Sequence, residues 1–372
     1  MTTLHSPLSG AALLADTAHS LKGTERWPVV EGIPFLRADR RDLADAALCA
    51  LDAGHAEEAL VLLLGDQDNW ARTPPPSEAN RRALVQDSRA SFRDAMDRLA
   101  FGPVSAYFAH RWSDPTFLSG LALAEAHWTR PRRVFELACG AGHYLREFAR
   151  LVPEVSGADI VFAKLWLARR YVAPRAALIC FDAAVPWPLA DKSADLLFCH
   201  DAFYFLPDKP HVASEMQRVS TGPVLVGHAH NALADNLSAG QPLAPAEYAA
   251  LFGEPLLYDD RELTAALIEA RAPRPATADA LASAPAIAMV AGAMPRPVLG
   301  GLAMPAAGAA LRRNPLYTGA DIRFPSERYA TEYGPLVTYP MQVEGPERAI
   351  AGDPGIETLA RRRVLVDLPS RW

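Results

Sequence analysis

The chain has 372 residues, half of them apolar, which is enough to bury the core of one main domain with additions or of two domains. Its formal net charge of −6 provides no general attraction to phosphate backbones or to anionic membranes. Nucleic acid and membranes are therefore disfavoured as partners.

The cysteines and the first residues favour a soluble, cytoplasmic protein. The four cysteines are scattered without a CxxC pair, so neither a disulfide framework nor a zinc knuckle is expected: Cys49, Cys139, Cys180 and Cys199. The segment MTTLHSPLSG lacks the basic region and the apolar core of a signal peptide. The apolar run at residues 60–64 is far too short to span a bilayer.

The first 130 residues divide into two parts. Residues 1–40 end in RWPVVEGIPFLR, where Pro and Gly separate short apolar pairs, as in a small β module. From Asp42 to Leu64 and from Glu78 to Leu99 the apolar residues recur at helical spacing, and ARTPPPSE interrupts them. We therefore expect a β module over residues 1–40 and a helical segment over residues 41–130.

Residues 131–295 carry the pattern of an α/β domain. Five apolar runs alternate with helical stretches: VFELA, VSGADI, ALICF, ADLLFC and GPVLVG. Such alternation is typical of βαβ units and predicts a largely parallel sheet. Residues 296–372 form a C-terminal extension, in which a Pro-, Ala- and Gly-rich connector leads to a tail that could cover the site or form a homodimer contact.

A glycine turn follows the first of these strands, in the stretch VFELACGAGH. Gly140 and Gly142 let the backbone approach a ligand, and the helix that follows presents free N–H groups. A dinucleotide fold would have a third glycine where this chain has Leu145. Glu136, inside the strand end, would repel a pyrophosphate but suits a ligand with an ammonium or sulfonium charge.

Two further acids follow the next two strands. Asp159 lies at the end of VSGADI, 23 positions after Glu136, where a carboxylate can accept both hydroxyls of a ribose. Asp182 directly follows the third apolar run. The chain thus places a glycine turn, a diol acceptor and a third acid at the carboxyl ends of successive strands.

This joint pattern resembles the class I methyltransferases that use S-adenosyl-L-methionine, over about residues 131–292. The resemblance implies a Rossmann-like, doubly wound, mostly parallel seven-stranded sheet, with S-adenosyl-L-methionine as cofactor. It also implies cofactor contacts at the methionine end for Glu136, Gly140 and Gly142, at the ribose for Asp159, and at the adenine for Asp182 and Ala183, with Ala138 and Ile160 as further cofactor-binding residues. Because Ala138 replaces the first glycine of the family pattern ExGxGxG, we expect cofactor binding to survive but its affinity could be reduced.

Methyl transfer to a hydroxyl group needs an aligned acceptor and a base. Candidates follow the fourth and fifth strands: His200 and Asp201 in CHDAF, and His228 and His230 in GHAHN. Strand alternation places His228 and His230 on one face, and an imidazole with a pKa of about 6.5 can act as a general base. The alternatives are a hydrogen-bonded structural histidine, an Asp201 that orients a histidine or begins a turn, and a metal site. No further ligand motif supports a metal, so none is expected.

The N-terminal module resembles the small zinc-ribbon-like modules found beside, or as partners of, methyltransferases that act on RNA or on translation proteins. Those modules have CPxC followed by PVxxGIP, whereas Ser6 and Ser9 occupy the cysteine positions here. The second cysteine pair is also absent between Leu21 and Trp27. We therefore expect a degenerate module without a metal, which serves as a lid or docking surface.

The favoured function is S-adenosylmethionine-dependent transfer of a methyl group to a small-molecule acceptor, at oxygen, by a histidine base. Two alternatives stay open. Methylation of RNA or protein would need the arginine pairs and triplet at residues 40–41, 312–313 and 361–363 to converge on one face. A non-catalytic binding subunit would retain the fold without the activity, and the sequence does not identify the acceptor.

Overall fold

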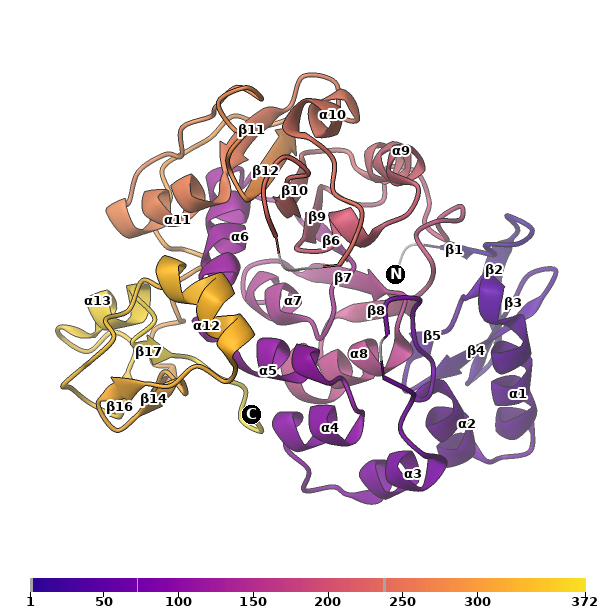
Figure 1. Cartoon of the computed structure of the whole chain (residues 1–372). Coiled ribbons are helices and arrows are strands. Elements are labelled where there is room, and N and C mark those ends of the chain that lie inside the picture. Colours follow the sequence, from indigo (N-terminus) through magenta and orange to yellow (C-terminus); the bar gives the residue numbers. More distant parts are fainter. Residues whose placement is uncertain (1–2, 72, 237–238) are drawn as a thin grey trace.

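The computed structural model describes residues 3–71, 73–236 and 239–372. Its centre is a seven-stranded sheet covered by helices, with a five-stranded sheet at one side and the C-terminal extension at the other (Figure 1). No helix in these described ranges is long and apolar enough to cross a membrane.

The central sheet has the strand order β11-β12-β10-β9-β6-β7-β8. Neighbouring strands from β10 to β8 are parallel, and β12 is antiparallel to both of its neighbours. The predicted Rossmann-like, mostly parallel, seven-stranded sheet is confirmed. Its strands are β6 (Arg133–Leu137), β7 (Glu154–Asp159), β8 (Ala177–Cys180), β9 (Leu196–His200), β10 (Val224–His230), β11 (Leu256–Asp259) and β12 (Ala286–Ala291).

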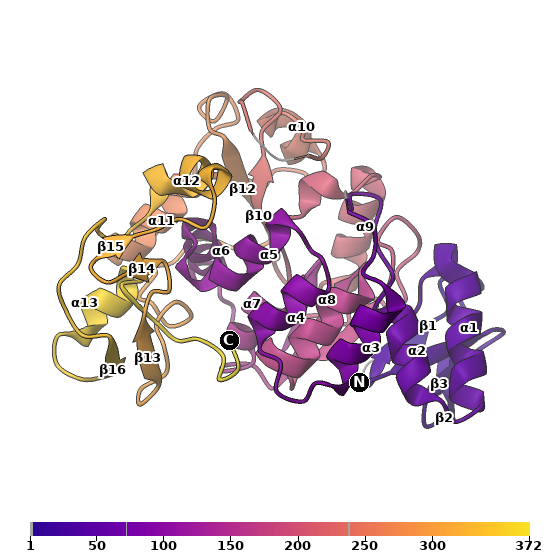
Figure 2. The ribbon, with the colours of Figure 1, turned by 60° about the horizontal axis from the view of Figure 1, so that its bottom comes forward.

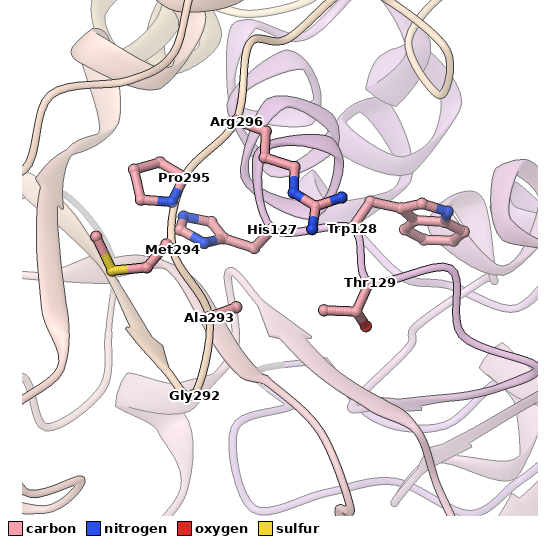
Figure 3. Close-up of a pocket in the computed structure, with 8 residues that line it drawn as sticks. All are labelled: His127, Trp128, Thr129, Gly292, Ala293, Met294, Pro295 and Arg296. Atoms are coloured by element: carbon pink, nitrogen blue, oxygen red, sulfur yellow. The ribbon is translucent and has the colours of Figure 1, made fainter.

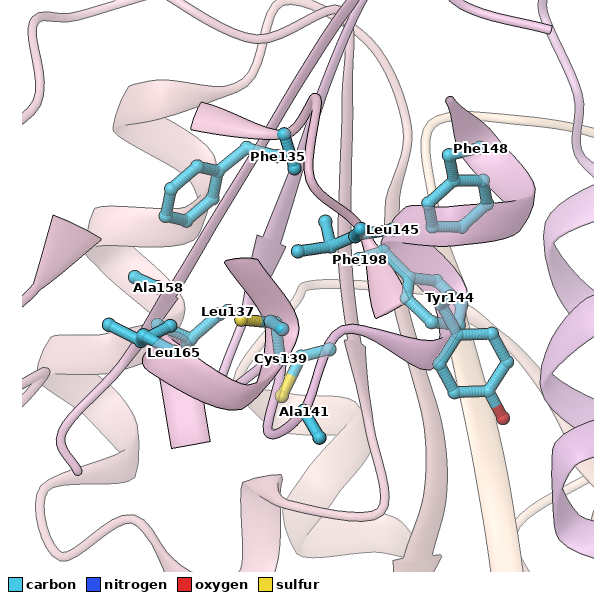
Figure 4. Packing of buried hydrophobic residues seen from close by; sticks show 14 of the residues in the cluster. Phe135, Leu137, Cys139, Ala141, Tyr144, Leu145, Phe148, Ala158, Leu165 and Phe198 are labelled. Carbon is cyan, nitrogen blue, oxygen red and sulfur yellow. The ribbon is translucent and has the colours of Figure 1, made fainter. Parts of the chain in front are cut away.

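Both faces of this sheet are buried, which is why its strands appear in the sequence as nearly continuous apolar runs. On one face, Phe198 of β9 packs against Phe148 of α7 (His143–Phe148), with ring centroids 5.3 Å apart (Figure 4). On the other face, Phe135 of β6 packs against Trp187, at 6.1 Å. The remaining helices of this domain are α8 (Phe162–Leu167), α9 (Lys209–Val219), α10 (Pro245–Ala250) and α11 (Asp260–Glu269).

The helical segment contains six α-helices in its described residues: α1 (Arg41–Asp52), α2 (Ala56–Leu63), α3 (Glu78–Gln86), α4 (Phe92–Arg98), α5 (Pro103–His110) and α6 (Pro115–Ala126). Each of the two predicted helical runs, 42–64 and 78–99, therefore divides into two helices. Helix α6 is buried on nearly every side because it packs against β10 and α11.

The N-terminal module is an antiparallel sheet of β1 (Leu4–His5), β2 (Ala12–Thr17), β3 (Ser20–Lys22), β4 (Arg26–Val30) and β5 (Ile33–Pro34). Trp27 and Ile33 are fully buried in it. The backbone N–H of Leu36, just after β5, donates to the carbonyl oxygen of Cys180 in β8 at 2.7 Å. This bond attaches the module to the edge of the central sheet.

A carboxylate joins the two serines that stand at the cysteine positions of the module. Ser6 Oγ donates to Glu25 Oε2 at 2.7 Å, and Ser9 Oγ donates to the same oxygen at 3.0 Å. Glu25 lies between β3 and β4, in the stretch where the second cysteine pair would stand. Hydrogen bonds therefore connect these two turns, and the resemblance to a zinc ribbon stays a prediction.

The C-terminal extension has two small sheets and two helices in its described residues: β13 (Ala310–Arg313), β14 (Tyr317–Thr318), β15 (Asp321–Ile322), α12 (Glu327–Tyr333), β16 (Arg348–Ile350), α13 (Ile356–Arg361) and β17 (Leu365–Val366). Its end returns to the helical segment, where Trp372 Nε1 donates to the carbonyl oxygen of Ala109 in α5 at 2.7 Å. Helix α12 lies beside α5 (Figure 2), and Tyr333 stacks on Tyr107 there, with centroids 6.1 Å apart. The proposed division of the chain at residues 40, 130 and 295 stays a prediction.

Candidate functional site

The glycine turn connects β6 to α7 through left-handed backbone. Ala138 and Gly140 both have φ of 53°, and Gly142 has φ of 80°. A Cβ atom on Gly142 would lie 2.9 Å from the Cβ atom of Ala168, so a side chain there would be both strained and crowded. Ala138, which replaces a glycine of the family pattern, adopts the conformation that favours glycine, at a cost of about 1 kcal/mol.

Glu136 lies at the end of β6, beside this turn, and is only 2% exposed. Its Oε2 atom is buried and has no hydrogen-bond partner among the described residues. Burial raises the pKa of its carboxyl group well above the usual value, and the positive charge of Arg111 only partly opposes that rise. The backbone N–H of Leu145 bonds the carboxyl group, but a buried carboxyl oxygen without a partner is costly, so this position fits the positively charged group of a ligand.

The two other strand-end acids also hold the backbone around them. Asp159 accepts the N–H of Gly140 at 3.0 Å and that of Val161 at 2.9 Å, and Lys164 Nζ lies 3.5 Å from it. Asp182 accepts the N–H of Ala184 at 2.9 Å. Asp159 therefore fixes the glycine turn as well as offering oxygen atoms to a ligand.

These acids open into one cavity of about 1030 Å³ at the carboxyl ends of the parallel strands. Of the predicted cofactor residues, Gly142 does not line it; its backbone conformation sets the turn. The seven that line it are Glu136, Ala138, Gly140, Asp159, Ile160, Asp182 and Ala183. The four predicted catalytic residues line the same cavity: His200, Asp201, His228 and His230.

His228 is held between two carboxylates. Its Nδ1 atom lies 2.9 Å from Asp260 Oδ2, and its Nε2 atom lies 3.9 Å from Asp201 Oδ1. Burial disfavours the imidazolium, but the charges of Asp260 and Asp201 outweigh burial and raise the pKa of His228 to about 9. In the ligand-free protein His228 is therefore protonated at neutral pH.

Regular strand alternation does not explain how His228 and His230 come to line the cavity. The pairing of β10 with β12 shifts register between Val226 and Ala229, and His228 has φ of 48°. A β-bulge therefore aims the two side chains toward each other, with ring centroids 5.2 Å apart. The two side chains lie close together, as strand alternation predicted, but the bulge and not regular alternation brings them together.

His230 is neutral at pH 7. It is 8% exposed, its ring stacks on Tyr204 with centroids 4.0 Å apart, and burial lowers its pKa to about 4. Its Nδ1 atom is buried and has no hydrogen-bond partner among the described residues.

His200 is enclosed more tightly than the other two histidines. Its Nδ1 atom accepts from Arg111 Nη2 at 3.3 Å, so Nε2 carries the proton, and Tyr144 Oη lies 3.1 Å from the same Nδ1 atom. Burial, followed by the charge of Arg111, lowers the pKa of His200 to about 3. The ring lies so close to Gly227 that a Cβ there would be 2.4 Å from His200 Cδ2. These contacts make His200 the least accessible of the candidate bases.

Three residues of this site had no signal in the sequence. The guanidinium group of Arg111, which follows α5, is buried and bonds Thr116 Oγ1 at 2.6 Å and Asp201 Oδ2 at 3.2 Å. Tyr107 Oη also donates to Asp201. Asp260 begins α11, about 60 residues beyond Asp201. Only the fold brings these side chains together, since each lies in a segment without a recognisable motif.

A second, smaller cavity of about 340 Å³ lies between the segment that follows α6 and the segment that follows β12 (Figure 3). His127, Met294 and Arg296 line it, and its described lining includes no carboxylate. It lacks the acids that distinguish the larger cavity.

Comparisons with known proteins agree with this geometry. Residues 135–222 match the sequence profile of a family described as "Methyltransferase domain", which covers β6 to α9. No curated protein matches the chain. The family match, together with an unpaired carboxyl oxygen of Glu136 that fits a cationic ligand, supports S-adenosylmethionine as the cofactor.

Solved structures similar to part of the chain include methyltransferases. The YcgJ protein of Bacillus subtilis is 15% identical, over 46% of this chain and 95% of that chain, with a TM-score of 0.33. A Haloferax volcanii putative methyltransferase complexed with the Trm112 activator is 17% identical, over 55% and 98%, with a TM-score of 0.36. Phosphoethanolamine N-methyltransferase 2 of Haemonchus contortus is 22% identical, over 44% and 40%, with a TM-score of 0.31.

Proposed function

We propose that this protein is an S-adenosylmethionine-dependent methyltransferase that methylates a small-molecule acceptor at oxygen. The observation that carries the proposal is one shared cavity. It brings Glu136, with its unpaired Oε2 atom, and the acids Asp159 and Asp182 together with Asp201, His228 and His230. A volume of about 1030 Å³ is at the upper end of ordinary ligand pockets, so it accommodates a cofactor and a small acceptor together.

The cofactor side of this cavity offers groups suited to each part of S-adenosylmethionine. Glu136 would hold the cationic methionine end, Asp159 the ribose hydroxyls, and Asp182 with Ala183 the adenine. The bound cofactor supplies a methyl group on a positively charged sulfur, which is already a strong electrophile. The chain's own task is to align the acceptor, to exclude water and to receive a proton.

His230 is the residue that would receive the proton of the acceptor hydroxyl. The neighbouring His228 has a raised pKa and is already protonated at neutral pH, and His200 is enclosed by Arg111 and Tyr144. His230 is neutral and has a ring nitrogen without a partner among the described residues. In this scheme Asp201 and Asp260 hold His228 as a cation beside the acceptor oxygen, where it stabilises developing negative charge.

The arginines offer less support for an RNA or protein acceptor. Arg40 and Arg41 pair with Asp66 and Asp45, next to the N-terminal module. Residues 312–313 lie in the C-terminal extension, on the opposite side of the molecule in both views (Figures 1 and 2). These pieces do not meet on one face, so they do not form a single electrostatic docking surface.

The test is an assay of S-adenosylhomocysteine formation with a panel of hydroxyl-bearing small molecules, and with RNA and protein extracts as comparison acceptors. We expect release that depends on a small molecule, and a rate reduced about 100-fold in His230→Gln. His55→Gln, which alters an exposed histidine, is the matched control. Release with RNA or protein alone would contradict the small-molecule proposal.

A further inference from the structure

We propose that Asp201, His228 and His230 bind one divalent transition-metal ion on the acceptor side of the cavity. A ligand atom from each of these side chains lies within 4.8 Å of the others. Asp201 follows β9 and the two histidines end β10, and these strands are parallel neighbours. The sequence shows only a His-Asp pair and an HxH pair, whereas the fold selects three of the four residues and leaves His200 out.

The backbone is strained at two of the three positions. Asp201 has φ of 55° and His228 has φ of 48°, in the left-handed region that favours glycine. The bulge between Val226 and Ala229 turns His228 and His230 toward Asp201. Strain at side chains that converge on a cavity is typical of functional sites.

The surrounding groups orient the proposed ligands in the way that metal sites require. Asp260 accepts from His228 Nδ1 at 2.9 Å, and Ser119 Oγ donates to the same Asp260 oxygen at 2.8 Å. This contact leaves His228 Nε2 toward Asp201 Oδ1, where the metal ion would replace the proton on Nε2, which passes to solvent. Carboxylates commonly hold the outer nitrogen of a histidine ligand and fix its tautomer.

His230 provides an independent observation. The residue is only 8% exposed, and its Nδ1 atom has no hydrogen-bond partner among the described residues. The side chain of Asn236 bonds the ring, and Tyr204 covers one ring face. A buried imidazole nitrogen without a partner at this cluster needs either a ligand or a proton to satisfy it.

Charge and donor type indicate the class of ion. Asp201 and Asp260 bring two negative charges, and Arg111, which bonds Asp201 Oδ2 at 3.2 Å, brings one positive charge. The other oxygen, Oδ1, lies 3.9 Å from His228 Nε2 and accepts from Tyr204 Oη at 2.8 Å, so its second lone pair is the one offered to the metal. Two imidazole nitrogens and one carboxylate suit Zn²⁺, Co²⁺ or Fe²⁺ better than Mg²⁺ or Ca²⁺, which prefer oxygen ligands.

The site would be open toward the acceptor. With metal–ligand distances of about 2.1 Å, tetrahedral ligand atoms lie about 3.4 Å apart, so the side chains must approach by about 1 Å. Three protein ligands leave a fourth position that faces the cavity, as in catalytic zinc sites. There an acceptor hydroxyl could bind, and His230 would then orient the acceptor instead of receiving its proton.

The experiment is a titration of chelator-treated, tag-free full-length protein with Co²⁺, followed by visible absorption and then by displacement with Zn²⁺. We expect one Co²⁺ per chain, and binding at least 10-fold weaker in His228→Gln and in His230→Gln. Asp260→Asn should keep the stoichiometry but weaken binding about 10-fold, because it loosens the outer contact. His55→Gln is the control, and circular dichroism establishes that each variant is folded.

The result that would overturn the proposal is wild-type protein without a stoichiometric Co²⁺ or Zn²⁺ site, or folded His228→Gln and His230→Gln variants that bind as the wild type does. S-adenosylmethionine binding is measured on the same samples. Cofactor binding without metal binding would contradict the metal site and leave the methyltransferase proposal in place, with His230 as the base. Metal binding without cofactor binding would support the metal site and contradict the methyltransferase proposal.

Discussion

Glu136 is a buried carboxyl group whose Oε2 atom has no hydrogen-bond partner among the described residues. Because burial raises its pKa, the group is protonated more easily than a solvated glutamate, and a cationic ligand beside it would favour the ionised form. Binding of S-adenosylmethionine should therefore release a proton from Glu136, and affinity should rise with pH. Calorimetry in buffers of different ionisation enthalpy measures that proton.

Glu136→Gln should remove both the released proton and the rise of affinity with pH, and it should weaken binding about 10-fold or more. Glu154→Gln, at the exposed start of β7, is the matched control. An equal proton release in wild type and Glu136→Gln would place the titrating group elsewhere.

At the scale of elements, Glu25 joins the two turns of the N-terminal module through Ser6 and Ser9. The hydrogen bond from Ser6 lowers the pKa of Glu25, so the link stabilises the module above the ordinary glutamate pKa of about 4.5 and is lost as pH falls below it. Because the site is solvated, Glu25→Gln should lower the free energy of unfolding by less than about 1 kcal/mol at pH 7.

Urea unfolding of the wild type and of Glu25→Gln at pH 7 and at pH 3.5 measures this link. The two proteins should differ at the higher pH and converge at the lower one. A difference that persists unchanged at pH 3.5 would show that the carboxylate charge is not what joins the turns.

The elements also show where sequence reasoning succeeded and where it stopped. The glycine turn and the acids Glu136, Asp159 and Asp182 could be found because each stands at the end of an apolar run, so a local pattern predicts its place at the sheet edge. The bulge in β10 could not be found, since HAH reads as regular alternation. Its cause is the pairing with β12, which lies more than 50 residues away.

At the scale of the whole molecule, buried histidines connect stability to pH. Burial lowers the pKa of His110 and His127 to about 4 and that of His143 to about 3. Since the unfolded pKa is about 6.5, the unfolded chain takes up these protons first as pH falls. Each histidine therefore removes about 1.4 kcal/mol of stability per pH unit between about pH 6.5 and its folded pKa.

Burial raises the pKa of Asp66 and of Asp114 to about 6, and these two acids act in the opposite direction. A variant is therefore needed to isolate one group. His127→Leu removes one proton that the chain takes up on unfolding. Between pH 6.5 and pH 5 the free energy of unfolding should therefore fall less steeply in the variant, by about 1.4 kcal/mol per pH unit, as measured by urea unfolding across that range. An identical pH dependence in both proteins would mean that His127 does not titrate as described.

The acceptor side depends on the whole chain. Tyr107 and Arg111 come from the helical segment, Asp260 from α11, and Tyr333 from the C-terminal extension. No local pattern marks any of them, because their contacts with Asp201, His228 and each other exist only after distant segments pack. The cytoplasmic location and the homodimer stay predictions.

The most direct test of the account is calorimetric titration of wild-type protein and Asp159→Ala with S-adenosylmethionine and S-adenosylhomocysteine. We predict saturable micromolar binding by the wild type, weakened by about 2 kcal/mol or more in the variant, because a charge-assisted contact to the ribose is lost. Asp191→Ala, at an exposed acid outside the cavity, is the control. Absence of binding by folded wild-type protein would contradict the account and would favour a fold retained without its cofactor.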